Sequence, residues 1–201
     1  MAINWSVPTR RACVTVHAFL TLDGYVADPS LPQTLTLWDK INTEQCSAYM
    51  LAHSDALIVG RHTYQALMAD DEWPYPDCPT YVLTRRALAV DHPCTVSDQP
   101  LEWLLQSLPA KQQHQVWLVG GRQLVLRALQ ENLLDEIVIH MLPITQGEGQ
   151  QFFEQLQQID FDLIDVARLA HGIVRMHYKV LSAEDLNTAA IMSVVASVHP
   201  Q

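Results

Sequence analysis

Short apolar runs that alternate with helix-like segments are the feature of this 201-residue sequence that most constrains its fold. The runs are "ACVTVHAF" (12–19), "ALIV" (56–59), "TYVLT" (80–84), "QVWLVGG" (115–121) and "DEIVIHMLPI" (135–144). Runs of this length that are apolar on both faces are typical of strands buried within a parallel sheet. Between them, segments such as "TEQCSAYMLAH" and "RQLVLRALQENLL" carry apolar residues at helical spacing. The sequence therefore predicts an α/β fold with a mostly parallel central sheet.

The end of the sequence has a different pattern. "FDLIDVARLA" (161–170) and "IVRMHYKVL" (173–181) are separated only by His171-Gly172, which predicts an antiparallel hairpin. Ser182 and Asp185 then resemble a capping box that begins a helix. We therefore expect one domain over residues 1–182 and a helical C-terminal tail over 183–201, which docks either on its own domain or on a partner subunit.

Charge and cysteine content restrict the partners of the chain. The formal net charge is −10, so most of the surface would repel nucleic acid or an anionic membrane, and we expect neither as a partner. Any bound anion needs a local cluster of cations. The cysteines show no C-x-x-C spacing and no zinc-ligand pattern, which predicts reduced thiols, no metal and a cytoplasmic protein.

Two predicted strand-to-helix junctions carry glycine followed by a cation. These are "LIVGRHT" (57–63) and "WLVGGRQL" (117–124). Glycine lets a ligand approach the backbone, and the positive end of the following helix attracts phosphate. Arg61 and Arg122 add guanidinium groups that suit phosphate oxygens. Glycines at strand ends also serve tight turns alone, so a phosphate site is indicated only where several such junctions lie on one sheet.

A third junction follows "TYVLT" and contains Thr84, Arg85 and Arg86. Paired arginines at a strand end favour the 2′-phosphate of NADP over the free ribose hydroxyls of NAD. The G-x-G-x-x-G signature of an ordinary Rossmann domain is absent. A different dinucleotide-binding fold is therefore expected.

Five segments together resemble the dihydrofolate reductase-like superfamily in their order along the chain. They are "TLDGYVA" (21–27), "DALIVGRHTYQAL" (55–67), "VWLVGGRQLVLRAL" (116–129), "LLDEIVIHMLPITQGEGQQFF" (133–153) and "MHYKVL" (176–181). Within the superfamily the chain most resembles the reductase domain of the bifunctional riboflavin-pathway deaminase-reductase and its stand-alone relatives. The resemblance implies a three-layer α/β fold that ends in an antiparallel hairpin. The zinc signatures of the deaminase half are absent, so only the reductase step is implied.

The resemblance also implies NADPH as the cofactor. It places Gly60, Arg61, His62 and Thr63 at the phosphates, Thr84 to Arg86 near the 2′-phosphate, and the backbone around Ala27 near the nicotinamide. The residues implied to wrap the pyrophosphate are Gly120, Gly121, Arg122, Gln123 and Leu124. Dihydrofolate reductases have a cis bond between the paired glycines, which predicts a cis Gly120-Gly121 peptide here.

The substrate side is less defined by the sequence. Asp39 and Glu44 flank the position where dihydrofolate reductases carry an acidic residue, so each is a candidate proton donor, and a site with no protein carboxylate is the alternative. Asp23 is a candidate substrate ligand or, more simply, a turn former beside Gly24. Trp38 is a candidate for stacking on a planar ring or for packing on the core. The histidines His17, His53, His140 and His177 are expected to be structural.

These inferences predict an NADPH-dependent reductase that transfers a hydride to a pterin- or pyrimidine-like small molecule, with riboflavin-type chemistry preferred over folate. True dihydrofolate reductase activity is one alternative. A non-catalytic module that binds NADP(H) or a partner protein is another. A homodimer is compatible with the apolar tail.

Overall fold

The structure is a computed structural model that describes residues 11–27, 43–68, 73–90, 93–154, 158–182 and 185. Its strands are β1 (Cys13–Thr21), β2 (Ala56–Gly60), β3 (Thr80–Leu83), β4 (Thr95–Ser97), β5 (Gln115–Val119), β6 (Glu136–Leu142), β7 (Phe161–Arg168) and β8 (Val174–Val180). Its helices are α2 (Thr43–Ala52), α3 (Arg61–Leu67), α4 (Leu101–Ser107) and α5 (Arg122–Gln130), with short 3-10 turns at Pro109–Lys111 and Ala170–Gly172.

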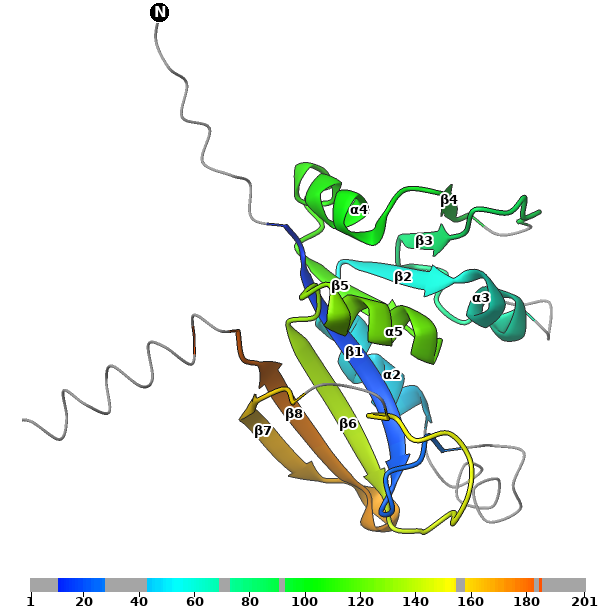
Figure 1. Cartoon of the computed structure of the whole chain (residues 1–201). Helices are drawn as coiled ribbons and strands as arrows, with labels where there is room; N and C mark the ends of the chain where they lie inside the picture. Colours follow the sequence, from blue (N-terminus) through cyan, green and yellow to red (C-terminus); the bar gives the residue numbers. More distant parts are fainter. Residues whose placement is uncertain are drawn as a thin grey trace, which may run out of the picture.

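All eight strands form one sheet in the order β4-β3-β2-β5-β1-β6-β8-β7 (Figure 1). The strands from β4 to β6 pair in parallel, whereas β8 pairs antiparallel with both β6 and β7. The predicted mostly parallel sheet and the C-terminal hairpin are thus confirmed. β4, a three-residue strand that pairs with β3, was not predicted from the sequence.

Helices cover both faces of the parallel part of the sheet, with α5 in front and α2 behind in Figure 1. Neighbouring residues of β2 point to opposite faces, so Leu57 packs with Met50 of α2 while Ile58 packs with Leu105 of α4. The side chains that α5 buries, Val125, Ala128 and Leu129, join the core that contains Ile58 and Leu105. Each fully buried Leu, Ile or Val side chain among them contributes about 1.5–3 kcal/mol. The result is the predicted three-layer arrangement.

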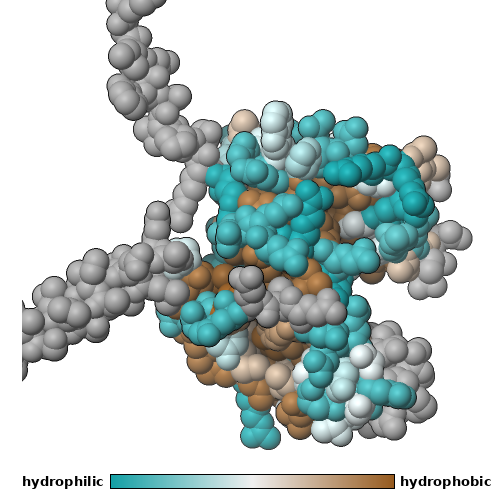
Figure 2. Space-filling view, in the orientation of Figure 1, coloured by the Kyte–Doolittle hydropathy of each residue, from teal (hydrophilic) through white to brown (hydrophobic). Residues whose placement is uncertain are grey.

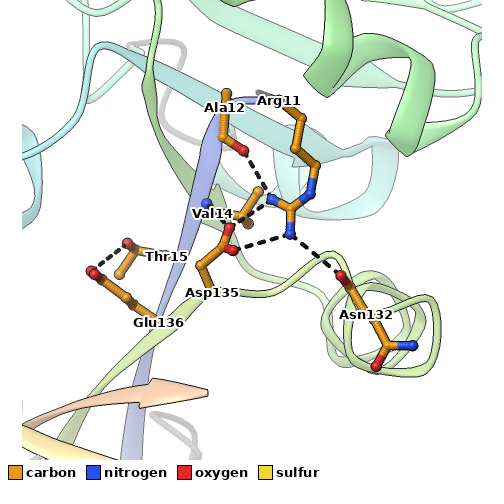
Figure 3. A network of polar contacts seen from close by, with 7 residues as sticks. All are labelled: Arg11, Ala12, Val14, Thr15, Asn132, Asp135 and Glu136. Atoms are coloured by element: carbon orange, nitrogen blue, oxygen red, sulfur yellow. Dashed lines mark hydrogen bonds and ion pairs between the residues drawn. The ribbon is translucent and has the colours of Figure 1, made fainter. Parts of the chain in front are cut away.

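The register between β1 and β6 is held at its start by an arginine–carboxylate pair (Figure 3). Arg11 donates from Nη1 to Asp135 Oδ2 at 2.6 Å and from Nη2 to Oδ1 at 3.0 Å. The same carboxylate accepts the backbone N–H of Val14 at 2.7 Å. Asp135, the residue that precedes β6, is therefore bonded both to Arg11, two residues before β1, and to the backbone of β1.

Candidate cofactor site

The two strand-to-helix junctions of the sequence and the third junction, at the end of β3, meet at one cavity of about 360 Å³. Residues that the sequence analysis singled out supply much of its lining: Gly60, Arg61, His62, Thr63, Thr84, Arg85, Gly121, Gln123 and Leu124. Leu83, Arg127 and the stretch from Ser97 to Leu101 complete the lining. The sequence predicted the junctions separately, and the structure brings them together.

The topology of the sheet explains why the junctions converge. The strands β3, β2 and β5 are parallel neighbours, so their carboxyl ends reach the same edge. From there α3 leaves toward the α2 face, where Tyr64 is buried, and α5 leaves toward the opposite face, where Val125 is buried. Helices that depart to opposite faces from adjacent strands leave a crevice between them, which is the usual ligand position in open α/β sheets.

Thr63 and the paired glycines bring two of the junctions into contact. A Cβ atom added at Gly120 would lie 2.6 Å from Thr63 Cγ2, and one added at Gly121 would lie 3.2 Å from Thr63 Oγ1. Both glycines have positive φ values, 66° and 63°. Only glycine combines this backbone conformation with such a close approach at low cost. The start of α5 is thereby packed directly against the start of α3.

The prediction of a cis Gly120-Gly121 bond is wrong for this structure, because none of the peptide bonds between described residues is cis. The left-handed conformation of the two glycines turns the chain from β5 into α5 with trans bonds.

The cavity has more cations than anions, although the whole chain is acidic. Arg61, Arg85 and Arg127 line it, and Asp98 is the acidic residue of its lining. Arg61 Nη2 donates to His62 Nε2 at 3.0 Å, which orients both side chains on the first turn of α3. Arg127 is held by Glu131 at 2.8 Å. This is the local cluster of cations that an anionic ligand of a protein with net charge −10 would need.

The third junction is ordered by a local turn. The N–H of Arg86 donates to Thr84 Oγ1 at 3.1 Å, and the N–H of Thr84 donates to Ser97 O at 2.9 Å. The second bond joins the end of β3 to the end of β4, so it also positions Ser97 to Leu101 at the cavity. Arg85 lines the cavity, whereas Arg86 does not.

Arg122 has partners that its sequence position did not suggest. It does not line the cavity; instead its Nε donates to Gln151 O at 3.2 Å and its Nη2 to Glu154 O at 2.9 Å. Its guanidinium also lies 3.7 Å from the Glu154 carboxylate. Arg122 therefore fastens the loop after β6 to the start of α5. Gly120 also lies outside the lining, where it supports Thr63.

Asp23 forms the predicted turn and holds a second loop. Its carboxylate accepts the Thr21 hydroxyl at 2.6 Å and the N–H groups of Gln146 and Gly147 at 3.0 and 2.8 Å. The Thr21 hydroxyl is the main reason that the pKa of Asp23 lies below its ordinary value. Ala27 is buried beside Leu142 and Ile173, and its N–H donates to Phe19 O. Neither Asp23 nor Ala27 lines the cavity.

Three candidates for the substrate side have little or no described structure. Asp39 and Trp38 lie outside the described residues. Glu44 lies in the first turn of α2, and only its backbone is described.

Beneath α2 the sheet carries a histidine pair that the sequence analysis expected to be structural. His17 on β1 and His140 on β6 approach to 2.6 Å between Nε2 and Nδ1. The Phe19 ring stacks on His140 at 5.0 Å, and the Trp117 ring lies 5.9 Å from His17. Burial lowers the pKa of His140 to about 4, with a further contribution from Arg175, and burial also lowers that of His17. His140 Nε2 has no hydrogen-bond partner among the described residues.

A second polar cluster follows the same face toward the start of the strands. His177 Nε2 lies 3.0 Å from Glu136 Oε2, and His177 Nδ1 lies 3.2 Å from the Tyr49 hydroxyl. The hydrogen bond with His177 is the main cause of the lowered pKa of Glu136. These three residues line a second cavity of about 350 Å³, away from the three junctions. No group that could hold a metal ion occurs among the described residues.

Some lining residues could have been found from the sequence. "TVSDQP" (95–100) is also a strand end followed by a helix, but its strand is too short and too polar to stand out. Arg127 lies further along the same helix as Gln123 and Leu124. The histidine pair has no local signal, because it depends on the pairing of residues 123 positions apart.

Comparison with known proteins gives a consistent result. Residues 12–175 match the family described as the RibD C-terminal domain. A Bacillus subtilis (strain 168) protein, the uncharacterized protein YwjB, is 28% identical over 145 residues, which cover 70% of this chain and 82% of that protein.

Solved structures show the same fold. A putative riboflavin biosynthesis protein from Shewanella sp. PV-4 has 25% identity and a TM-score of 0.72, covering 85% of this chain and 99% of that one. Acinetobacter baumannii RibD has 22% identity and a TM-score of 0.65, and the match covers 85% of this chain but 58% of that chain. Schistosoma mansoni dihydrofolate reductase has 14% identity and a TM-score of 0.60 over 86% and 100% of the two chains. The fold is therefore dihydrofolate reductase-like.

Proposed function

The chain belongs to the RibD C-terminal domain family, and we propose that within it the protein is an NADPH-dependent reductase that acts on a pyrimidine- or pterin-like small molecule. The observation that carries the proposal is the single cavity at the ends of β2 and β3 and the start of α5, where three arginines face one carboxylate. Solved relatives of similar fold include a Thermotoga maritima deaminase and 5-amino-6-(5-phosphoribosylamino)uracil reductase, which favours riboflavin-type chemistry over folate.

The donor set of the cavity fits a phosphorylated dinucleotide. Arg61 and His62 at the start of α3, with Gly121 and Gln123 at the start of α5, would hold the pyrophosphate. At a helix start the first backbone N–H groups lack partners within the helix and are available to phosphate oxygens. Arg85, at the end of β3, would hold the 2′-phosphate that distinguishes NADPH from NADH.

Bound NADPH would supply the hydride. The chain's own residues would then have to orient the cofactor and the substrate, exclude water and deliver a proton. A ligand held by its phosphates at β2 and β3 would extend along the same sheet edge toward β5 and β1. On the α2 face of β1, Phe19 and His17 are partly exposed, and they pack on the buried Trp117 of β5 and His140 of β6. Flat aromatic groups suit a heterocyclic substrate ring. Burial lowers the pKa of both imidazoles, so His17, the partly exposed member of the pair, would accept or donate a hydrogen bond at neutral pH without adding charge.

Cofactor binding and turnover test the proposal in the full chain. We expect NADPH to quench tryptophan fluorescence with higher affinity than NADH. We then expect loss of absorbance of NADPH when a phosphoribosylamino-pyrimidine is added, and a slower or absent reaction with dihydrofolate. If NADPH binds but is not oxidised in the presence of any pyrimidine, dihydropterin or flavin, the protein is a binding module and not an enzyme. Absence of NADPH binding would overturn the cofactor site itself.

A further inference from the structure

The hairpin end of the sheet has an apolar face that no described helix covers. Its register places Leu163 opposite Tyr178 and Val166 opposite Met176, so these side chains share one face. Met176 and Tyr178 pack partly on the core beneath α4 and α5, which identifies the face. Leu163 and Val166 are nevertheless 49% and 56% exposed. In Figure 1, α5 lies in front of β5 and the upper part of β1, and no described helix lies in front of β8 and β7.

Aromatic rings extend this surface toward the start of β7. Phe153 and Phe161 lie 6.0 Å apart, and Phe161 and Tyr178 lie 6.1 Å apart, measured between ring centroids. Apolar residues gather in the same region of Figure 2. We name this surface the outer apolar face, made up of Phe153, Phe161, Leu163, Val166, Met176 and Tyr178. Contiguous exposed apolar surface of this kind marks a contact site in a protein.

The opposite face of the same hairpin is polar. Arg175 and Asp165 form an ion pair there at 2.8 Å, and Lys179 and Asp162 are paired in the register beside them. An apolar segment that packs on the hairpin therefore has only one suitable face.

The chain leaves the sheet at the edge of this face, where Ser182 and Asp185 are joined by hydrogen bonds. The N–H of Leu181 donates to Asp160 O at 2.9 Å, which keeps the chain beside β7. The N–H of Asp185 donates to Ser182 Oγ at 3.2 Å, and the N–H of Ser182 donates to Asp185 Oδ2 at 2.9 Å. These reciprocal bonds are a capping box. Lys179 adds an ion pair with Asp185 at 2.8 Å.

The segment that follows has the composition of a buried helix. From Leu186 to the end of the chain no Asp, Glu, Lys or Arg occurs, and Leu186, Ala190, Val194 and Val198 recur every four residues. A helix over residues 183–198 would be about 24 Å long. The eight residues of β7 span about 26 Å, so the helix and the hairpin match in length.

We propose that residues 183–198 form a helix that docks on the outer apolar face of their own chain. The helix runs antiparallel to β8 and completes the layer that α4 and α5 begin. Docking within the chain is favoured over a second copy because the helix starts at the edge of the face, which gives a high effective concentration.

A pair of introduced cysteines tests this arrangement. With Val166→Cys and Val194→Cys in the full chain, mild oxidation at low protein concentration is expected to give a disulfide within one chain, identified by peptide mass spectrometry. Asp162→Cys with Val194→Cys, on the polar face, is the control and is expected to remain unlinked. A disulfide only between two chains would assign the face to a second copy and overturn the proposal, as would equal linking of both pairs or no linking.

Hydrogen exchange in the full chain provides a second test that does not require a disulfide. Val194→Asp introduces a charge on the docking side of the helix and is expected to raise amide exchange in β7 at least several-fold. Ala196→Asp introduces the same charge on the opposite side and is expected to leave exchange in β7 unchanged. Equal effects of the two substitutions, or no effect of either, would contradict the proposed docking.

Discussion

Arg85 and Arg86 are adjacent in the chain and both exposed, yet only Arg85 lines the cavity at the end of β3. If Arg85 holds the 2′-phosphate, Arg85→Ala is expected to raise the Kd for NADPH about tenfold or more, the equivalent of about 1.4 kcal/mol. The Kd for NADH is expected to stay the same, because NADH has no phosphate at this position. Fluorescence titration with both cofactors measures the two constants.

Arg86→Ala is the matched control, since it removes the same charge one residue away. It is expected to change the NADPH affinity little. Equal losses in the two variants would indicate a general charge effect, and no loss in either would place the 2′-phosphate elsewhere.

At the residue scale, the sequence predicted positions better than side-chain directions. Arg61 and Arg122 each follow a glycine at a strand end, and the sequence pattern treats them alike. In the structure Arg61 lines the cavity, whereas Arg122 turns to the carbonyl groups of Gln151 and Glu154. The difference arises from a loop about thirty residues away in sequence, and no local pattern records it.

Among elements, the contact of Arg11 with Asp135 is a specific link between β1 and β6 (Figure 3). Asp135→Asn is expected to lower the free energy of unfolding by about 1–3 kcal/mol, because it weakens two charge-assisted bonds at a partly buried site. Urea unfolding at neutral pH measures the change.

Glu131→Gln is the control, because Glu131 pairs with Arg127 on the surface of α5. Exposed pairs of this kind contribute about 0.5 kcal/mol or less. A loss for Asp135→Asn no larger than for Glu131→Gln would mean that the link does not stabilise the sheet.

Strands and helices were predictable where their apolar residues are buried on both faces or along one stripe. β2, β5 and α5 are of this kind. The strands of the terminal hairpin, β7 and β8, are mostly exposed or half-buried, and they were predictable from the short His171-Gly172 turn between two strand-like segments. β4 was not predicted because Thr95, Val96 and Ser97 are mostly exposed at the sheet edge, so the strand lacks the run of apolar residues that marks a buried strand. Of the predicted tail helix over 183–201, only Asp185 lies among the described residues, where it is helical.

Among the described residues, none of the helices has the length and apolar character that a membrane span requires.

For the whole molecule, the buried histidine pair predicts loss of stability in mild acid. The pKa of His140 is lowered from 6.5 to about 4, and that of His17 is also lowered. The unfolded chain therefore binds protons that the folded chain excludes, so the stabilisation is complete above pH 6.5 and is lost as the pH falls toward 4. For His140 this loss amounts to at most about 3 kcal/mol. Urea unfolding at pH 7.5 and pH 5 measures it.

His140→Gln cannot take up a proton, so its unfolding free energy is expected to change less between these two pH values. His114→Gln removes an exposed histidine and is expected to keep the full pH dependence. If His140→Gln kept it as well, the acid sensitivity would have to come from other groups, such as Glu136, whose pKa is also lowered.

The cavity at the sheet edge is assembled from four separate stretches of the chain, between Gly60 and Arg127. Three of these stretches begin helices. Of these helices, α3 and α5 belong to opposite layers, and Thr63 of α3 packs against the glycines that precede α5. No part of the cavity therefore survives alone when the sheet opens. A ligand bound there is coupled to the folding of both layers at once, so saturating NADPH should raise the melting temperature of the entire domain in a single transition.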